Sequence, residues 1–394
     1  MNRMLFILIL FATLISFTGC INIKLARSEI QDMTFIQVIG IDKVPGQDKV
    51  RVTIISKHTV SKKEGELIPE NTISVEGETI FDAIRKLNMY SIRKPFWAHA
   101  DFILIDEEAA KDGIIKYLDF FSSQNQFRLA IKPLIVIGDT AERVITTSST
   151  KELFISDKLD LLVKNLSNLS VSDNIELRDL LEIFDRPYAS AFIPCIYQTD
   201  TIYKEKSESE KQDIAMNGFA IFENGKMIGY IKNDQAKGLN WVNGRYKSGV
   251  IVVRDEIGKK ISLEVINEET KVLPKINNNN KLSITVIIKV LSNIGEMYSN
   301  TDIFNEKSFR FMEEQQQEIV KSQAESIIKY AQENKADMLY MWNRVFHKYP
   351  KKWKNMYNKW PEVFSNIPFT VEVDSKIVRR YMLKQPIGAM EVEK

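Results

Sequence analysis

A short apolar segment at the N-terminus ends at a cysteine, and it restricts how the rest of the chain can be held together. Residues 4–17 are almost all apolar, and Arg3 is the one charged side chain before Cys20. A run of about 14 apolar residues matches the core of a secretory signal and is too short to cross a bilayer comfortably. The sequence therefore predicts an exported chain whose first segment is removed.

The residues around Cys20 also predict how the exported chain stays at a membrane. Thr18 and Gly19 are small residues directly before a cysteine, as in a bacterial lipobox, although Phe17 stands where leucine is usual. We predict cleavage between Gly19 and Cys20, with S-diacylglycerol and N-acyl groups on Cys20. The alternative is a plain signal peptide, or an uncleaved anchor, with an incidental cysteine.

Cysteine usage then limits what can stabilise the fold. The chain has two cysteines, so lipidation of Cys20 leaves Cys195 alone and no intramolecular disulfide can form. The 394-residue chain is too long for one ordinary core even after 19 residues are removed. We therefore expect two or three domains that are held by hydrophobic cores alone.

Composition narrows the range of partners. With 44% hydrophobic and 27% charged residues the chain is typical of folded globular proteins. Its 54 basic and 52 acidic residues nearly balance, so nucleic acid is not expected as a partner, because phosphate binding needs a basic excess. No apolar run after residue 19 is long enough to span a bilayer, so attachment is expected to depend on the lipid.

The N-terminal part alternates predicted strands and helices. Strands are predicted at 35–41, 50–55, 72–75, 100–105 and 129–137, and helices at 77–87, 107–121, 152–166 and 174–184. This order indicates a layered α/β unit. Pro133 cannot donate to a strand ladder, so it suggests that its strand is an edge or contains a bulge.

The second half is richer in strands. Asn224-Gly225 tolerates the two positive φ angles of a type I′ turn, so a β-hairpin is predicted around it. Further strands are predicted at 250–253, 261–266, 270–273, 282–291 and 369–378. A long helix is predicted from an N-cap at Ser308 to about Asn334, with a buried stripe that consists of Phe309, Met312, Ile319, Ala324, Ile327 and Ile328.

Two polar stretches are candidate domain boundaries. The run 204–211 is charged and poor in apolar residues, so it is either a linker or the tip of a solvated hairpin. The tract 277–280 consists of four asparagines. Together with cleavage before Cys20, these positions predict a signal peptide at 1–19, an N-terminal α/β domain at 20–200, a middle β-rich domain at 201–276 and a C-terminal α+β domain with the long helix at 277–394.

Catalytic signals are weak throughout the sequence. The nucleophile elbow, the phosphate-binding glycine loop and the paired-histidine zinc motif are all absent. His58, His99 and His347 are far apart, so a metal site is not expected. Carboxylates are plentiful, but no pair stands out as an acid and base. We predict no catalytic residue, no cofactor and no metal.

Aromatic residues alternate with lysines from Tyr349 to Trp360. This pattern suits docking on anionic headgroups or on single-stranded nucleic acid. It also suits two amphipathic helices that bury the aromatic residues and are separated at Pro350. We favour the second interpretation, because the aromatic positions recur at helical spacing on one face before Pro350 and on another after it.

Several stretches occur in an order that resembles one known family. They are Arg27-Ser28-Glu29-Ile30-Gln31-Asp32, Ile39-Gly40-Ile41-Asp42-Lys43, Glu76-Gly77-Glu78-Thr79-Ile80-Phe81-Asp82-Ala83-Ile84-Arg85, Trp97-Ala98-His99, Leu118-Asp119-Phe120-Phe121, Gly218-Phe219-Ala220-Ile221-Phe222, Gly229-Tyr230, Gly238-Leu239-Asn240-Trp241-Val242-Asn243-Gly244, Lys247-Ser248-Gly249-Val250, Lys335-Ala336-Asp337 and His347-Lys348-Tyr349-Pro350-Lys351-Lys352-Trp353. Together with Cys20 they resemble the C subunit of spore germinant receptors, the Ger(x)C lipoprotein family.

The resemblance implies a fold and a function. It implies an α+β protein of three mixed α/β domains, with mixed or antiparallel sheets flanked by helices, after a lipoprotein signal peptide. It implies a non-catalytic, lipid-anchored protein on the outer surface of the spore inner membrane. It also implies assembly with multipass A and B subunits into a receptor required for nutrient-triggered germination.

Two other functions stay open at this point. A solute-binding lipoprotein of a transporter would share the length and the anchor, although such proteins usually have two parallel α/β lobes around a hinged cleft. A surface hydrolase that acts on cell wall would need two convergent carboxylates in a groove.

Overall fold

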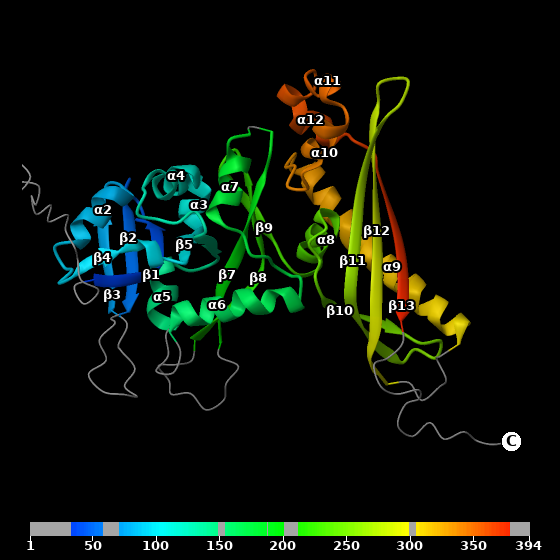
Figure 1. Ribbon diagram of the computed structural model, residues 1–394, viewed down its shortest axis with the longest axis horizontal. Coiled ribbons are helices and arrows are strands. Elements are labelled where there is room, and N and C mark those ends of the chain that lie inside the picture. Colours follow the sequence, from blue (N-terminus) through cyan, green and yellow to red (C-terminus); the bar gives the residue numbers. More distant parts are fainter. Residues whose placement is uncertain are drawn as a thin grey trace, which may run out of the picture.

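The computed structural model describes residues 33–57, 71–148, 154–186, 188–200, 212–298 and 305–378. In these residues a nine-stranded and a four-stranded sheet, both mixed and both flanked by helices, lie toward opposite ends of an elongated molecule (Figure 1). The predicted cleavage and lipidation site at Gly19 and Cys20 and the charged run 204–211 lie outside the described residues.

The first sheet combines a parallel centre with antiparallel margins. Its order is β3-β2-β1-β5-β6-β7-β8-β9, and the short strand β4 pairs with the start of β1. Strands β1, β5, β6 and β7 are parallel to one another and form the centre of the sheet. Strands β2 and β3 on one margin, and β8 and β9 on the other, join it through antiparallel pairs. The bounds are β1 Met33–Lys43, β2 Val50–Lys57, β3 Asn71–Gly77, β4 Lys94–Phe96, β5 Phe102–Asp106, β6 Lys132–Val136, β7 Ala191–Asp200, β8 Gln212–Glu223 and β9 Lys226–Ile231.

Helices cover both faces of this sheet, which explains its continuous apolar runs. On β5, Ile103 and Ile105 belong to the large core, whereas Phe102 and Leu104 belong to a second core beneath α5 and α6. A strand that is buried on both faces needs no polar alternation. The helices are α2 Ile80–Leu87, η2 Trp97–His99, α3 Glu107–Gly113, α4 Ile115–Ser123, α5 Ala141–Ser148, α6 Ile155–Asn165, η3 Leu166–Asn168 and α7 Leu177–Phe184.

Two predictions for this half were wrong in detail, and one helix was missed. The helix expected at 107–121 is two helices, because Gly113 has a φ of 133° and interrupts it. Pro133 lies on β6, which is an internal strand without a bulge. The strand tolerates the proline because β6 pairs with β7 only at Ile135 and Val136, so the missing N–H at position 133 costs no bond to β7. Helix α5 was not predicted.

The hairpin at Asn224-Gly225 is confirmed. Asn224 has a φ of 49° and Gly225 has a φ of 74°, and the flanking residues Glu223 and Lys226 are paired between β8 and β9. The turn also receives a tertiary contact, because the backbone N–H of Ile114 donates to the Gly225 carbonyl at 2.8 Å. The interruption between α3 and α4 therefore lies against the hairpin.

Replacing Gly225 with valine is expected to lower the free energy of unfolding by roughly 1–3 kcal/mol, measured by chemical denaturation. The new side chain would adopt a positive φ, and its Cβ would stand 2.4 Å from Ile115 Cδ1. Gly46→Val is the matched control, because Gly46 has a φ of 71° but no atom within 4 Å of a Cβ. Equal losses for the two variants would contradict the packing part of this argument.

The second sheet has the order β10-β11-β12-β13, with the first three strands antiparallel and β13 parallel to β12. The strands are β10 Gly249–Arg254, β11 Lys260–Ile276, β12 Leu282–Met297 and β13 Phe369–Val378, the last with the predicted bounds. The strands predicted at 261–266 and 270–273 are one strand, because β12 pairs along all of it and a register shift near Val265 absorbs the irregularity. Asn277 and Asn280 form the turn between β11 and β12.

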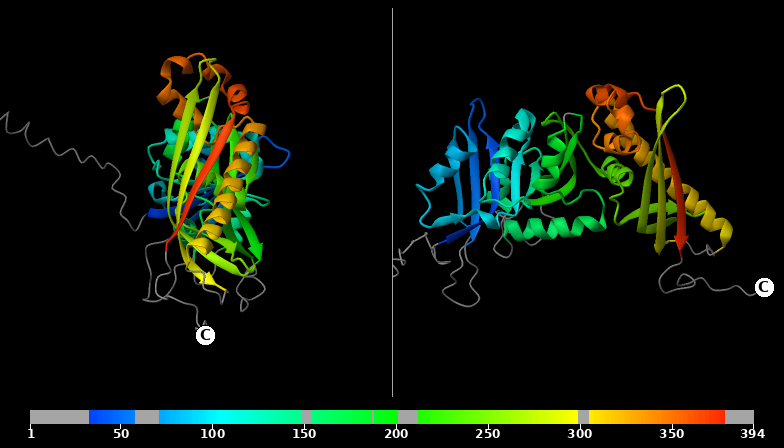
Figure 2. Two further views of the ribbon diagram at one scale, coloured as in Figure 1. Left: turned by 90° about the vertical axis from the view of Figure 1, so that its right-hand side faces the viewer. Right: turned by 45° about the horizontal axis from the view of Figure 1, so that its top comes forward.

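Helix α9, Glu306–Glu333, lies along one face of this sheet (Figure 2). Its N-cap is Asn305 and not Ser308, because the Asn305 side chain accepts a bond from the Ser308 backbone N–H at 2.9 Å. The predicted stripe is buried at Met312, Ala324, Ile327 and Ile328 and half-buried at the other two positions.

Helix α8, Asn233–Asn243, lies between the two sheets, and the C-terminal helices gather at one end of the second sheet (Figure 1). The C-terminal helices are α10 Met341–Lys348, α11 Pro350–Trp353, η5 Tyr357–Lys359 and α12 Trp360–Ser365. Trp342, Trp353 and Trp360 are buried here, which confirms the core interpretation of the tryptophans. Phe346 and Tyr357 are exposed.

The domain boundaries predicted at 201 and 277 stay a prediction. The first sheet continues from β7 into β8, and the β11–β12 hairpin includes the second position.

Candidate functional site

Cys20 and Gly19, the residues predicted for lipidation and cleavage, lie outside the part of the chain that the structure describes, as does His58. His99 packs against the Phe35 ring at 5.0 Å, and His347 packs against Phe346 at 5.2 Å. Among the described residues no group of three histidine, cysteine or acidic side chains could hold a metal ion. The stretches named above for their resemblance to one family form three polar networks, around Asp42, α8 and Asp337.

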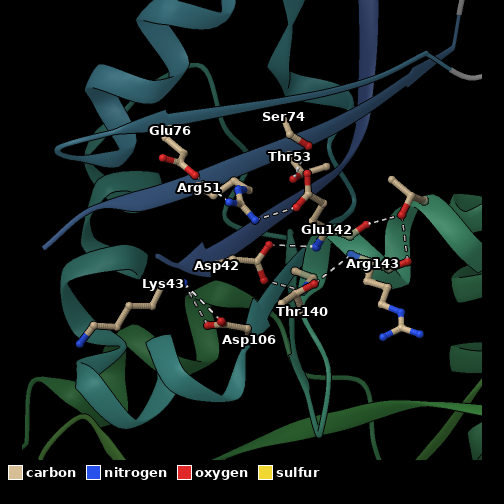
Figure 3. A network of polar contacts seen from close by, with 12 residues as sticks. Asp42, Lys43, Arg51, Thr53, Ser74, Glu76, Asp106, Thr140, Glu142 and Arg143 are labelled. Atoms are coloured by element: carbon tan, nitrogen blue, oxygen red, sulfur yellow. Dashed lines mark hydrogen bonds and ion pairs between the residues drawn. The ribbon is translucent and has the colours of Figure 1, made fainter. Parts of the chain in front are cut away.

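The stretch that contains Asp42 forms a network of polar contacts at the end of β1 (Figure 3). The Asp42 carboxylate accepts bonds from the backbone N–H groups of Ala141 at 2.5 Å and Glu142 at 2.9 Å, so it caps the start of α5. Asp106, at the end of β5, accepts from Ala109 N at 2.7 Å and from Lys43 N at 3.3 Å. Two adjacent strands thus each end on a carboxyl group that binds a helix terminus.

Burial controls the charge of these two groups. It raises the pKa of Asp42 to about 6, and it raises that of Asp106 to about 7 with a further contribution from the nearby Asp42 charge. The two residues are 2% and 4% exposed. Their oxygens meet backbone N–H groups and not solvent, so the pair does not offer the groove-facing acid and base that a hydrolase needs.

Arg51 joins this network to the sheet margin. Its guanidinium binds Glu76 at 2.6 Å and Glu142 at 2.8 Å, so one side chain connects β2, β3 and α5. The Asp42 network is therefore a structural device that fixes α3 and α5 against the parallel centre of the sheet.

A second group of family-like residues lies on α8, between the two sheets. Gly238 lies directly against α9, since a Cβ built on it would stand 2.2 Å from the Gln323 carbonyl oxygen. The Trp241 indole N–H donates to Gln323 Oε1 at 2.9 Å, and Gln323 Nε2 donates to Asp234 at 2.9 Å. The Trp241 ring stacks on Tyr246 with centroids 3.4 Å apart.

Helix α8 also contacts the loop before α7, which belongs to the first sheet's half of the molecule; we call the contacts of α8 with the two halves the α8 junction. Asn240 Nδ2 donates to the Ser170 carbonyl at 2.8 Å, and the Ser170 hydroxyl donates to the Ser248 carbonyl at 2.6 Å. Asn243 Nδ2 reaches the Met338 carbonyl at 3.2 Å. The stretch 238–244 thus connects the loop before α7, the long helix α9 and the C-terminal helices.

Asp337 organises the C-terminal helices. It is fully buried and accepts three bonds, from Met341 N at 3.0 Å, Trp342 N at 2.7 Å and Trp360 Nε1 at 2.8 Å. Burial raises the pKa of this carboxyl to about 6. One side chain therefore caps α10 and fixes the tryptophan that begins α12.

An open cavity of about 580 Å³ lies beside α8. The Arg245–Asp173 ion pair, 2.8 Å apart, and Glu268 are among its lining residues, and burial raises the pKa of Glu268 to about 7. These groups suit polar contacts with a partner. Cys195 contributes no reactive thiol, because it is buried and burial raises its pKa.

Sequence reasoning missed several residues of these networks. Gln316 and Gln323 lie on the buried stripe of α9, which runs through 312, 316, 320, 323 and 327, so extending the helical repeat through polar positions could have found them, although hydrophobicity could not. Asp106 precedes a predicted helix and could have been identified as its N-cap. The contact between Asp42 and α5 had no signal in the sequence.

Comparison with known proteins adds a family to this geometry. The model described as "Spore germination protein N-terminal domain" matches residues 26–197. The model described as "Spore germination B3/ GerAC like, C-terminal" matches residues 217–381. The first thus covers β1 to β7, and the second covers α8, α9 and the second sheet.

Similar proteins match along most of their length. Spore germination protein KC of Bacillus subtilis (strain 168) is 22% identical and is covered over 98% of both chains. The putative spore germination protein YfkR of the same organism is 24% identical, with 89% of this chain and 90% of the relative covered. The crystal structure of the GerBC protein has the same fold, with a TM-score of 0.54, 18% identity and coverage of 86% of this chain and 96% of that one. Within the described residues, no helix has the length and apolar character needed to cross a membrane.

Proposed function

Because the chain belongs to the GerAC-like family of spore germination proteins, a family of germinant receptor C subunits, we propose that it is the lipid-anchored, non-catalytic subunit of a nutrient germinant receptor. The observation that carries the proposal is the succession of two family matches, which together reach from residue 26 to residue 381. The chain thus has both parts that such a subunit is built from.

The geometry supports a binding role in preference to a chemical one. The buried carboxyls Asp42, Asp106 and Asp337 use their oxygens on backbone and indole N–H groups. The α8 junction connects two sheets into one body. Such a body suits the presentation of surfaces to the multipass A and B subunits, with Cys20 carrying the lipid on the outer surface of the spore inner membrane.

The alternative of a solute-binding lipoprotein finds less support. Such proteins usually have two parallel α/β lobes around a cleft. Here the second sheet has three antiparallel strands and one parallel strand.

Deletion of the gene tests the proposal. In spores with no other nutrient receptor, loss of this protein is expected to abolish germination by the nutrient while leaving germination by a non-nutrient agent unchanged. Restoring the wild-type gene should restore the nutrient response. An undiminished nutrient response in the deletion strain would contradict the proposal.

The lipid site has its own test. Cys20→Ala is expected to release the protein from spore membranes and to remove the diacylglycerol mass from its N-terminus, because the substitution removes the thiol that carries the proposed lipid. The body itself should fold normally, with an unfolding midpoint equal to that of the wild-type chain. Full membrane retention of the variant would show that contacts with other subunits are sufficient.

A further inference from the structure

The loop between α2 and β4 exposes large apolar side chains at its tip. Ile92 is fully exposed, Met89 is 70% exposed and Tyr90 is 62% exposed. Phe81, on the first turn of α2, adds a 45% exposed ring nearby. Scattered exposed apolar residues are ordinary, but neighbouring ones on one projection indicate a surface that something covers.

The backbone of this loop is ordered. Met89 N donates to Lys86 O, and the N–H groups of Tyr90 and Ser91 both donate to Leu87 O, each at 3.0 Å. Leu87 is buried in the core. The apolar side chains are therefore held outward by a hydrogen-bonded turn on a fixed base, so their exposure is a feature of the fold.

Basic residues flank the apolar tip. Arg85, Lys86, Arg93 and Lys94 lie on its two sides, and no acidic residue occurs from 85 to 94. Arg85 lies over the Phe81 ring at 4.8 Å, and Lys86 is paired with Asp82 at 2.7 Å. Within the described part of the chain, Arg85, Arg93 and Lys94 form no ion pair, so three cations flank the tip and complement an anionic surface.

The loop lies close to the start of β1, the strand that follows the predicted lipid anchor in the sequence. Strand β4 follows the loop directly, and its first residue Lys94 pairs with Met33, the first residue of β1. Figures 1 and 2 both show this end of the first sheet at the extremity of the molecule opposite the second sheet. Cys20 precedes Met33 by thirteen residues, which reach at most about 45 Å.

We propose that the segment Asn88–Arg93 is a membrane-docking tip. Met89, Tyr90 and Ile92 enter the interface of an anionic bilayer, while Arg85, Arg93 and Lys94 contact lipid headgroups. Tyr90 has the amphipathic ring that is favoured at such interfaces. The inference rests on the proposed lipid anchor for its location, and it implies that the second sheet points away from the membrane.

Depth-dependent quenching tests the tip in the full lipidated protein. Ile92→Cys is labelled with an environment-sensitive fluorophore, and the protein is placed in vesicles that contain phosphatidylglycerol and acyl-chain spin-labelled lipid. Cys195 is buried, so it reacts little. We expect strong quenching at position 92 and none in the control Asn279→Cys, which labels the β11–β12 turn.

The charges are tested in the same labelled protein. Arg93→Gln with Lys94→Gln is expected to weaken docking on anionic vesicles by about fivefold per lost charge, read as reduced quenching. The matched pair Lys259→Gln with Lys260→Gln, exposed near the second sheet, should leave quenching unchanged. Vesicles of phosphatidylcholine alone should give the weaker docking with any of these chains.

Each other outcome overturns the inference in a distinguishable way. Protein that stays on the vesicles with an unquenched label at position 92 contradicts the tip but leaves the anchor and the proposed function intact. Protection of position 92 that requires added A and B subunits assigns the tip to a protein partner. Protein that leaves the vesicles altogether contradicts the lipid anchor as well.

Discussion

Asp337→Ala is expected to lower the free energy of unfolding by about 3–5 kcal/mol, measured by chemical denaturation. The substitution removes the acceptor of three buried donors, the backbone N–H groups of Met341 and Trp342 and the indole N–H of Trp360. It also opens a cavity at a fully buried position. Helix α10 loses its cap and α12 loses its attachment in a single step.

The matched control for this change is Asp374→Ala, which removes an exposed carboxylate from β13 in the same half of the molecule. Surface substitutions of this kind usually change stability by no more than about 0.5 kcal/mol. Similar losses for the two variants would contradict the role assigned to Asp337.

The loss of stability in Asp337→Ala is also expected to depend on pH. Burial raises its folded-state pKa to about 6, above its ordinary value of 3.8. The folded protein therefore binds the proton more tightly than the unfolded chain, and the resulting stability is present below about pH 4 and lost as the pH rises through 6. The gap between wild type and Asp337→Ala should be larger at pH 4.5 than at pH 7.5, by roughly 1–2 kcal/mol. A gap that widens toward neutral pH would contradict this sign.

Local patterns predicted the elements of this fold better than their connections. The Asn224-Gly225 turn, the long helix and the strand at 369–378 each depend on neighbours in sequence, and each is found where it was expected. Helix α5 was missed, because its start is fixed by Asp42, which is 99 residues away from Ala141. Contacts over such separations leave no periodicity to detect.

The junction illustrates a different limit. Hydrophobic spacing found the apolar part of the α9 stripe but passed over Gln316 and Gln323, because polar residues do not register in such a pattern. Gln316 donates to Ser292 at 2.6 Å and accepts from Ser375 at 2.5 Å, so it joins α9 to β12 and β13. The position of α9 on the sheet is thus fixed partly by polar residues, which a hydrophobic pattern predicts to be exposed.

Gly238→Ala is expected to destabilise the protein by about 2–3 kcal/mol, although alanine is the better helix former. Helix propensity alone predicts a gain of about 1 kcal/mol. The structure predicts the opposite sign, because the new Cβ would stand 2.2 Å from the Gln323 carbonyl oxygen and 3.2 Å from Ile327 Cγ2. Backbone cannot give way as a side-chain end does, so α8 has to move away from α9, and overpacking of this kind typically costs 1–3 kcal/mol or more.

A second measurement distinguishes a clash between α8 and α9 from the effect that any glycine-to-alanine substitution has on stability. Displacement of α8 should break the bond between the Trp241 indole and Gln323, which is detected as faster hydrogen exchange of the Trp241 indole N–H. Gly295→Ala is the matched control, because a Cβ there meets its nearest atom, Ser262 O, at an ordinary 3.5 Å. A stabilised Gly238→Ala protein with a protected indole would mean that α8 and α9 do not lie in direct backbone contact, and the junction between the two sheets would then have to be held by the Asn240–Ser170 side instead.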